Sequence, residues 1–432
     1  MTKTIENRHY QALENAPEQP DEPGRRRFLK QSVGVGTGMA TLGATTISNV
    51  AFGASDDAAE EADDASDLPD VIDWKDEDAM ILHGRSPITL ETKRYTVGTS
   101  GITPATRLYI RNNLPVPDEK IVADRDAWQV SIEGVKNAKS LSVGELKTMG
   151  LTSVVMVLQC SGNGRGFFDH TPSGSQWRTG ASGNVVWGGV PLKDVIAALG
   201  GPADGMKFLT STGGEELPKG LDEDKIQVER SIPIEKALDD VLLAWEMDGQ
   251  PIPLVHGGPL RVIVPGYYGC NNIKYVKRVA LTPKESAAHM QKFSYRVRPI
   301  GVEASPDQPT MWDMNVKSFI TGPGAKPGET VRAGHHVIYG VAFGGNEAVK
   351  DVDISIDGGQ NWQKAELFGA DMGRYAWRTF RFEADLPAGK YVLASRATNQ
   401  SGEVQPQYRL ENQRGYANNS WHDHALSIVV KG

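Results

Sequence analysis

The spacing of apolar segments changes near residue 305 of this 432-residue chain, and this change most limits how it can fold. Before that point, strand-like runs alternate with helix-like runs: 154–158 is continuously apolar, as buried strands are, and 191–199 is amphipathic. After it, short alternating segments follow one another, separated by turn residues. They predict strands at 315–320, 336–343, 352–356, 375–382 and 391–398. We therefore predict a mixed α+β domain over residues 79–305, followed by a β-sandwich over residues 306–432.

The N-terminus resembles an export signal. Arg25, Arg26 and the Phe28-Leu29-Lys30 run after them fit the twin-arginine pattern, and a Gly/Ala/Thr-rich run with small residues at 51–54 follows. We expect residues 1–54 to be a twin-arginine signal peptide that directs the chain to the periplasm or another extracytoplasmic place. Residues 55–78 hold twelve acidic residues and one base, Lys75, and this composition predicts a disordered linker.

The charge and the cysteines exclude several classes of protein. The net charge of −8 comes from the linker, so the folded part is nearly neutral and has no nucleic-acid footprint. No stretch beyond the N-terminus is both apolar and long enough to span a bilayer. The two cysteines, Cys160 and Cys270, fit either one disulfide or two buried thiols. No CxxCH haem pattern and no multi-cysteine cluster pattern occurs.

The densest chemical signal is the segment 158–165, Leu-Gln-Cys-Ser-Gly-Asn-Gly-Arg. Cys160 ends a buried strand, and the glycine-rich turn after it lets the backbone approach a ligand. The nearby Arg165 would favour a thiolate. Taken alone, Cys160 is as well explained as an inert buried thiol, and no histidine pattern supports a cysteine hydrolase.

Four segments together resemble the sulfite oxidase family in order and in spacing. They are 109–117 (YIRNNLPVP), 158–165, 244–266 (ending HGGPLRVIVPG) and 269–274 (GCNNIK). The resemblance covers about residues 80–430 and implies a molybdopterin-binding catalytic domain followed by an immunoglobulin-like dimerisation domain. It also implies that Cys160 holds molybdenum together with the pterin dithiolene and oxo groups, so that a Cys160–Cys270 disulfide should be absent.

The resemblance assigns the remaining site residues. Arg111 and Arg165 match anion-binding arginines, Tyr295 an active-site tyrosine, and Trp177 a tryptophan that shapes the substrate pocket. The pterin contacts correspond to Asn113, His256, Arg261, Asn272 and Lys274, whose cations would neutralise the terminal phosphate. Each residue also has an ordinary structural interpretation, such as a paired surface arginine or a loop histidine bonded to the backbone.

Three departures from the family pattern leave contacts open. Asn113 stands where the family has a histidine. An acidic pterin contact is expected near 221–224 without a unique alignment. The last substrate-pocket arginine has no clear match, since residues 421–424 read Trp-His-Asp-His. Two histidines lie in this stretch, His422 and His424, and the favoured interpretation is that they cap the sandwich. As a metal-binding pair they would lack a third ligand.

The resemblance implies oxidation of sulfite to sulfate with a molybdenum–molybdopterin cofactor in a homodimer. Because the chain has no haem pattern, the electrons are expected to go to a separate acceptor such as a c-type cytochrome. Methionine-sulfoxide reduction is the nearest alternative, although those relatives generally lack the C-terminal sandwich. Sulfane-sulfur dehydrogenation, nitrate reduction and an exported binding module are further alternatives.

Overall fold

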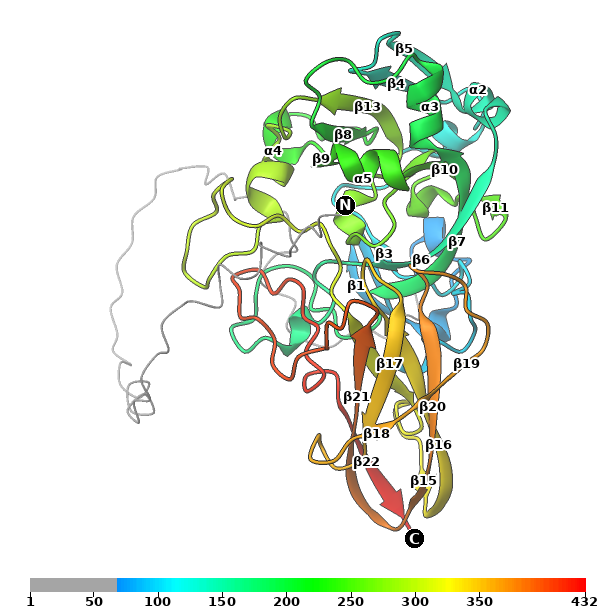
Figure 1. Ribbon diagram of the computed structural model, residues 1–432, viewed down its shortest axis with the longest axis vertical. Helices are drawn as coiled ribbons and strands as arrows, with labels where there is room; N and C mark the ends of the chain where they lie inside the picture. The colour runs from blue at the N-terminus through cyan, green and yellow to red at the C-terminus, as the bar shows by residue number, and fades with distance from the viewer. Residues whose placement is uncertain (1–67) are drawn as a thin grey trace, which may run out of the picture. The chain divides into compact units, whose positions relative to one another are not determined.

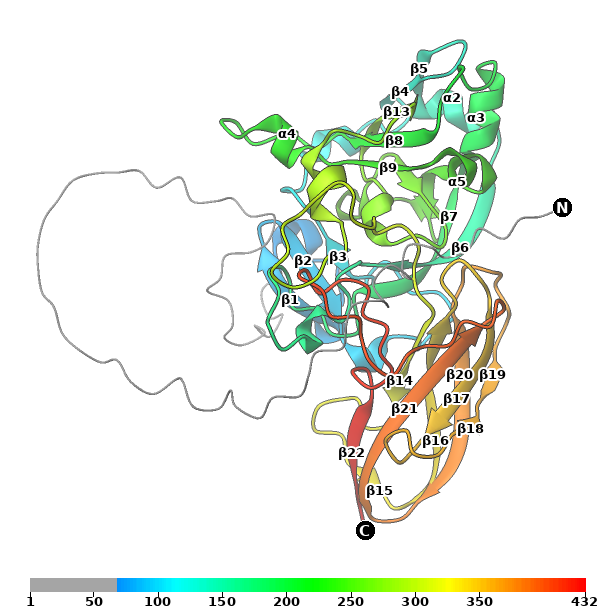
Figure 2. The same ribbon diagram turned by 60° about the vertical axis from the view of Figure 1, so that its left-hand side comes forward.

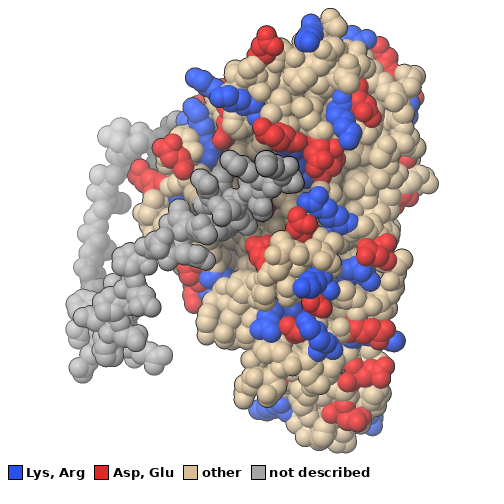
Figure 3. Space-filling view, in the orientation of Figure 1, with Lys and Arg blue, Asp and Glu red and all other residues tan. Residues whose placement is uncertain are grey.

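The computed structural model describes residues 68–432. The expected signal peptide and residues 55–67 of the expected linker lie outside this range. Within it, no helix is long and apolar enough to cross a membrane. On the face shown in Figure 3, acidic and basic side chains are interspersed.

The linker prediction is wrong for residues 68–78. This segment forms the 3-10 turns Asp70–Ile72 and Glu77–Ala79, and the side chains of Ile72 and Lys75 are buried. Leu68 and Ile72 pack in an apolar cluster with Met80, Leu90 and Val255. A few well-spaced apolar residues therefore anchor an otherwise acidic segment.

The first domain contains three sheets (Figure 1). Neighbouring strands in them pair antiparallel, except for β4 and β13, which pair parallel. The first contains β1 (Met80–Arg85), β2 (Ile88–Thr92) and β3 (Ile110–Arg111). The second contains β6 (Thr152–Gln159), β7 (Ser182–Pro191), β10 (Leu242–Met247), β11 (Gln250–Pro251) and β12 (Arg261–Ile263). The third has the order β5 (Lys139–Ser142), β4 (Gln129–Glu133), β13 (Val276–Thr282), β8 (Phe208–Gly213) and β9 (Glu229–Pro233). The mixed α+β prediction is confirmed.

The α-helices that residues 68–432 form are short. They are α2 (Val143–Thr148), α3 (Leu192–Ala198), α4 (Glu223–Ile226) and α5 (Ile234–Asp239). The expected capped helix is α2, where Ser142 accepts from the backbone N–H of Glu145 and the Glu145 side chain accepts from that of Ser142. This reciprocal arrangement satisfies two backbone donors that a helix start leaves unpaired.

Strand β6 carries the chain from the surface into the interior. Its first two residues are exposed and its last four, Met156–Gln159, are buried. All eight residues pair with β7, from Thr152 opposite Gly189 to Gln159 opposite Ser182. Cys160 therefore directly follows a strand whose last residues are buried and paired with β7.

The second domain is a sandwich of two sheets (Figures 1 and 2). One has the order β14 (Lys317–Gly322), β16 (Gly334–Phe343), β20 (Arg378–Leu386) and β19 (Glu366–Phe368). The other has the order β15 (Val331–Arg332), β22 (Leu426–Lys431), β21 (Gly389–Asn399), β17 (Val349–Ser355) and β18 (Gln363–Lys364). Each of the five strands expected from sequence overlaps β14, β16, β17, β20 or β21. Apolar side chains such as Ile338, Phe380 and Leu393 form the core between the sheets.

The loop between β21 and β22, residues 400–425, packs on the first domain. Ala417 N–H donates to the Ser161 carbonyl at 2.9 Å, and the Asn418 amide donates to the Gly164 carbonyl at 3.0 Å. The turn that follows Cys160 is thus held by the second domain.

Candidate active site

Two adjoining pockets meet at Cys160, and both are lined by Arg111, Asn113, Ser161, Met290 and Tyr295 as well. The larger of the two, here called the main pocket, is also lined by His256, Arg261 and Lys274. The smaller, here called the arginine pocket, adds Arg165, Gly174, Ser294, Arg414 and Tyr416.

Cys160 sits at the first residue after β6. Its backbone N–H donates to the Ala181 carbonyl at 2.9 Å, and its own carbonyl accepts from Asn163 N–H at 3.0 Å. The side chain is partly exposed into the pockets, and neither Cys160 nor Cys270 forms a disulfide. Burial raises the pKa of the Cys270 thiol to about 11, so Cys270 stays protonated at neutral pH.

Three arginines converge on the arginine pocket: Arg111, Arg165 and Arg414. No carboxylate from residues 68–432 lines this pocket. Arg165 is 6% exposed and is held by two backbone carbonyls, through Nε to Arg414 at 2.9 Å and through Nη1 to Ser175 at 3.0 Å. Burial lowers the pKa of Arg165, and the neighbouring cations Arg414 and Arg111 act in the same direction. An anion would relieve this concentration of positive charge.

Glycines make room for the Arg165 guanidinium. A Cβ on Gly162 would lie 2.5 Å from Arg165 Nη2, and a Cβ on Gly174 would lie 2.7 Å from Nη1. Gly164 has a φ of +94°, which starts the 3-10 turn Arg165–Phe167. The glycine-rich turn expected from sequence therefore serves the arginine as well as the thiol.

Arg414 was missed by the sequence analysis, which sought the last arginine at 421–424. It lies in the 400–425 loop, where its Nη1 donates to Ser173 Oγ at 2.6 Å. It also lines a third hollow with Arg298 and with surface residues 301–303, so it stands between the arginine pocket and the surface. The signal available in the sequence was the length of this loop, since long irregular loops in compact domains are often functional.

Tyr295 closes one side of both pockets. Its hydroxyl donates to Asn113 Oδ1 at 3.3 Å, and its ring stacks on that of Tyr416 with centroids 5.6 Å apart. Burial raises the pKa of Tyr295, so the phenol remains a donor. The Tyr416 hydroxyl donates to the Ser294 carbonyl at 2.9 Å, which ties the C-terminal loop to the tyrosine.

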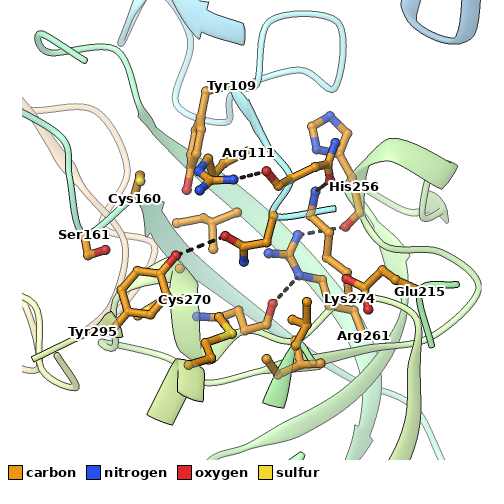
Figure 4. A pocket seen from close by; sticks show the side chains of 18 residues that line it. Tyr109, Arg111, Cys160, Ser161, Glu215, His256, Arg261, Cys270, Lys274 and Tyr295 are labelled. Carbon is orange, nitrogen blue, oxygen red and sulfur yellow. Dashed lines mark hydrogen bonds between the residues drawn. The ribbon is translucent and has the colours of Figure 1, made fainter. Parts of the chain in front are cut away.

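Basic groups gather at the other end of the main pocket, with His256, Arg261 and Lys274 opposite Cys160 and Tyr295 (Figure 4). Lys274 Nζ donates to Asn112 Oδ1 and to the Val255 carbonyl, both at 2.6 Å. Arg261 donates to the His256 carbonyl at 2.8 Å, and burial lowers its pKa to about 10. Burial also lowers the pKa values of His256 and Lys274.

The acid at this end is Glu215, not a residue of 221–224 as expected. Asp222 and Asp224 lie at the start of α4 and are exposed. Glu215 is the one carboxylate that residues 68–432 contribute to the main pocket. Burial raises its pKa to about 7, with Lys274 partly opposing the shift.

The side chains of Asn272 and Trp177 are each held by contacts with other residues of the protein. Asn272 lines the main pocket, but its side chain accepts from Val264 N–H at 2.8 Å and donates to the Tyr268 carbonyl at 3.2 Å, so it shapes the backbone. Trp177 is fully buried and does not line the main pocket or the arginine pocket. It packs edge-on against Tyr109, which does line the main pocket, with centroids 6.3 Å apart. Trp177 therefore supports the wall from behind.

The His422–His424 pair does not line either pocket. His424 is buried and its Nδ1 pairs with the Ser420 carbonyl at 2.7 Å, whereas His422 is exposed. Among residues 68–432, no group of three or more His, Cys, Asp or Glu side chains is placed to hold a metal ion.

The donors that are present fit a molybdenum–pterin group bound through one thiolate. Cys160 supplies a soft ligand, and the cofactor brings its own sulfur donors. The buried Ser161 Oγ lies beside it, and Ser161 lines both pockets. Arg261 and Lys274 can provide the positive charge that a phosphate requires, and His256 adds a neutral ring.

Comparison with known proteins gives matches over both domains. Residues 113–290 match the family model described as oxidoreductase molybdopterin binding domain, and residues 308–429 match the Mo-co oxidoreductase dimerisation domain. Human mitochondrial sulfite oxidase is 34% identical over 369 residues, covering 80% of this chain and 65% of the human protein, so the chain spans just under two thirds of that relative. Sulfite oxidase of Arabidopsis thaliana is 30% identical over 375 residues, covering 80% of this chain and 93% of the plant protein.

A solved structure with a similar fold is the sulfane dehydrogenase SoxCD from Paracoccus pantotrophus. It aligns with a TM-score of 0.67 at 26% identity, covering 80% of this chain and 84% of that chain. The alignment therefore extends over most of the described residues.

Proposed function

This chain belongs to the sulfite oxidase family of molybdopterin-binding oxidoreductases, and from this membership we propose that it oxidises sulfite to sulfate. The observation that carries the proposal is the arginine pocket, in which Arg111, Arg165 and Arg414 converge beside Cys160 without an opposing carboxylate from residues 68–432. Such a site suits a small, highly charged oxyanion.

We assign the cofactor to the main pocket, with Cys160 as the protein's thiolate ligand to molybdenum. Asn113, His256, Arg261, Asn272, Lys274 and Glu215 would surround the pterin and its phosphate. When bound, the molybdenum centre supplies the two-electron redox change and the oxygen-atom transfer.

The chain's own residues bind and orient the anion. Arg165 is fixed by backbone carbonyls before the anion arrives, so its charge needs no reorganisation during the reaction. Arg111 and Arg414 complete the positive wall. The protonated hydroxyl of Tyr295 can donate to an anion held there. Met290 and the ring of Tyr416 limit the access of water.

We further propose an electron acceptor, an oligomeric state and a cellular location for the protein. We assign the electrons to a separate carrier such as a c-type cytochrome, because the sequence contains no CxxCH pattern. Residues 308–429 match a dimerisation domain, which supports a homodimer through the sandwich. Export by the twin-arginine pathway rests on Arg25–Lys30 in the sequence.

A sulfane-sulfur dehydrogenase is the second candidate, favoured by the similarity to the solved sulfane dehydrogenase. Both candidates would oxidise a sulfur substrate and pass its electrons to an acceptor. They differ in the size of the substrate that the arginine pocket must bind. A free sulfite ion is smaller than thiosulfate, which contains a sulfane sulfur.

One experiment separates the candidates. The exported protein is purified, its molybdenum content is measured, and reduction of ferricyanide or cytochrome c is followed with sulfite, with thiosulfate and with no donor. Sulfite-dependent reduction at about one molybdenum per chain is the expected result. Activity restricted to a sulfane donor would support the second candidate. Methionine-sulfoxide-dependent oxidation of a reduced dye, without sulfite activity, would overturn both.

A further inference from the structure

Lys75 makes an unusual set of contacts for a residue in an acidic segment. Its side chain is 4% exposed, and its ammonium contacts the Ala105 carbonyl at 2.5 Å, the Leu108 carbonyl at 2.6 Å and His256 Nε2 at 2.9 Å. An ammonium carries three N–H donors and no acceptor, so these three contacts use all of them. Burial of this charge is costly, which indicates that its position matters.

The contact with His256 fixes the histidine ring. A charged Lys75 can only donate, so Nε2 then accepts and the ring proton lies on Nδ1. Burial and the neighbouring cations lower the pKa of His256, so the imidazole is neutral. His256 lines the main pocket with Arg261 and Lys274. Lys75 itself is not a lining residue and lies behind the histidine.

The rest of the segment 68–79 holds the same turn. The Trp74 ring meets His256 edge-on with centroids 6.1 Å apart, and Lys75 Nζ lies 4.7 Å from the Trp74 ring centroid. Ile72 packs with Val255, the neighbour of His256 in the chain. Polar and apolar contacts from one segment therefore converge on the turn Leu254–His256.

We propose that Lys75 is a positioning residue for the anionic end of the cofactor: it holds His256 in one tautomer, and residues 68–79 act as a latch that keeps the cofactor in the main pocket. The side chains of Arg261 and Lys274 line this end with the neutral His256 and one carboxylate among the described residues, and Lys75 lies behind the histidine. This arrangement favours a dianion such as a phosphate ester. The proposal rests on the proposed cofactor but not on the identity of the sulfur substrate.

Cofactor retention tests the latch. Purified holoenzyme of wild type, Lys75→Met and the control Lys120→Met is held at raised temperature. Released pterin and retained molybdenum are then measured over time. Lys120 is a suitable control because its side chain is 90% exposed. Lys75→Met should lose the cofactor about 10- to 100-fold faster, the range expected when a charge-assisted hydrogen bond is removed. A rate equal to that of the control would overturn the proposal.

A double-mutant cycle separates positioning from general stability. If Lys75 acts through His256, adding Lys75→Met to His256→Gln should change the release rate by less than about twofold. Fully multiplicative effects would show that Lys75 does not act through the histidine.

A third measurement requires no variant. In ¹⁵N-histidine-labelled wild-type protein, His256 should be protonated at Nδ1, and protonation at Nε2 would contradict the tautomer assignment. Cofactor retention at the control rate in Lys75→Met would overturn the latch proposal, whereas absent sulfite activity in wild type would overturn the proposed function. The two failures are therefore distinguishable.

Discussion

Glu215 should make the stability of the cofactor-free protein depend on pH in a defined direction. Its pKa rises from 4.5 to about 7 because the carboxyl is buried. Below pH 4.5 both folded and unfolded states are protonated, and the stability contribution is fully present. Between pH 4.5 and 7 the folded state binds more protons, so the free energy of unfolding falls as pH rises. The shift corresponds to a loss of roughly 3 kcal/mol, complete once the pH is above about 7.

Glu215→Gln removes the titration while keeping nearly the same shape. Urea denaturation of cofactor-free wild type and Glu215→Gln is measured between pH 4 and 8. The variant should gain stability relative to wild type with rising pH, reaching a difference roughly 3 kcal/mol larger at pH 8 than at pH 4. Glu216→Gln is the matched control, because Glu216 is the adjacent, exposed glutamate, and it should follow the wild-type curve. A difference between Glu215→Gln and wild type that stays constant with pH would refute the reasoning.

Three further predictions follow from the site. Cys160→Ser should leave a folded protein whose molybdenum content by elemental analysis is close to zero per chain; wild-type content would remove Cys160 as the ligand. Arg414→Met should raise the KM for sulfite about 10- to 100-fold, with a smaller effect on kcat, because one charged hydrogen-bond donor is lost; an unchanged KM in steady-state assays would exclude Arg414 from substrate binding. Arg230 is 1% exposed and donates to Asn271 Oδ1 and the Met290 carbonyl, so Arg230→Met should lower the free energy of unfolding by about 1–3 kcal/mol, measured by chemical denaturation; an unchanged midpoint would show that these hydrogen bonds contribute nothing.

The parts of the site that could be predicted from sequence lie in continuous segments. The buried run that becomes β6 leads directly into Cys160, and the glycines after it accommodate Arg165. The capping box of α2 is another local pattern, complete within four residues. Local periodicity and turn chemistry suffice for such features because the residues that determine them are neighbours in the chain.

The contacts that could not be predicted join segments far apart in the sequence. Arg414 reaches the pocket because the 400–425 loop folds back over the turn after Cys160. Glu215 lines the main pocket, whereas Asp222 and Asp224, in the range where an acid was expected, are exposed. Lys75 was assigned to disorder from composition, which averages over the few apolar residues that anchor its segment.

The sandwich is a structural part of the arginine pocket, independent of any role in dimerisation. Arg165 donates to the backbone carbonyl of Arg414, and its guanidinium lies 5.5 Å from the Tyr416 ring centroid. The position of Arg165, an arginine of the first domain, therefore depends on the C-terminal loop. Arg414 is among the groups that lower the pKa of Arg165, so an anion bound between the two guanidinium groups would interact with both domains. Anion binding and the order of residues 412–416 are consequently coupled, and each should stabilise the other.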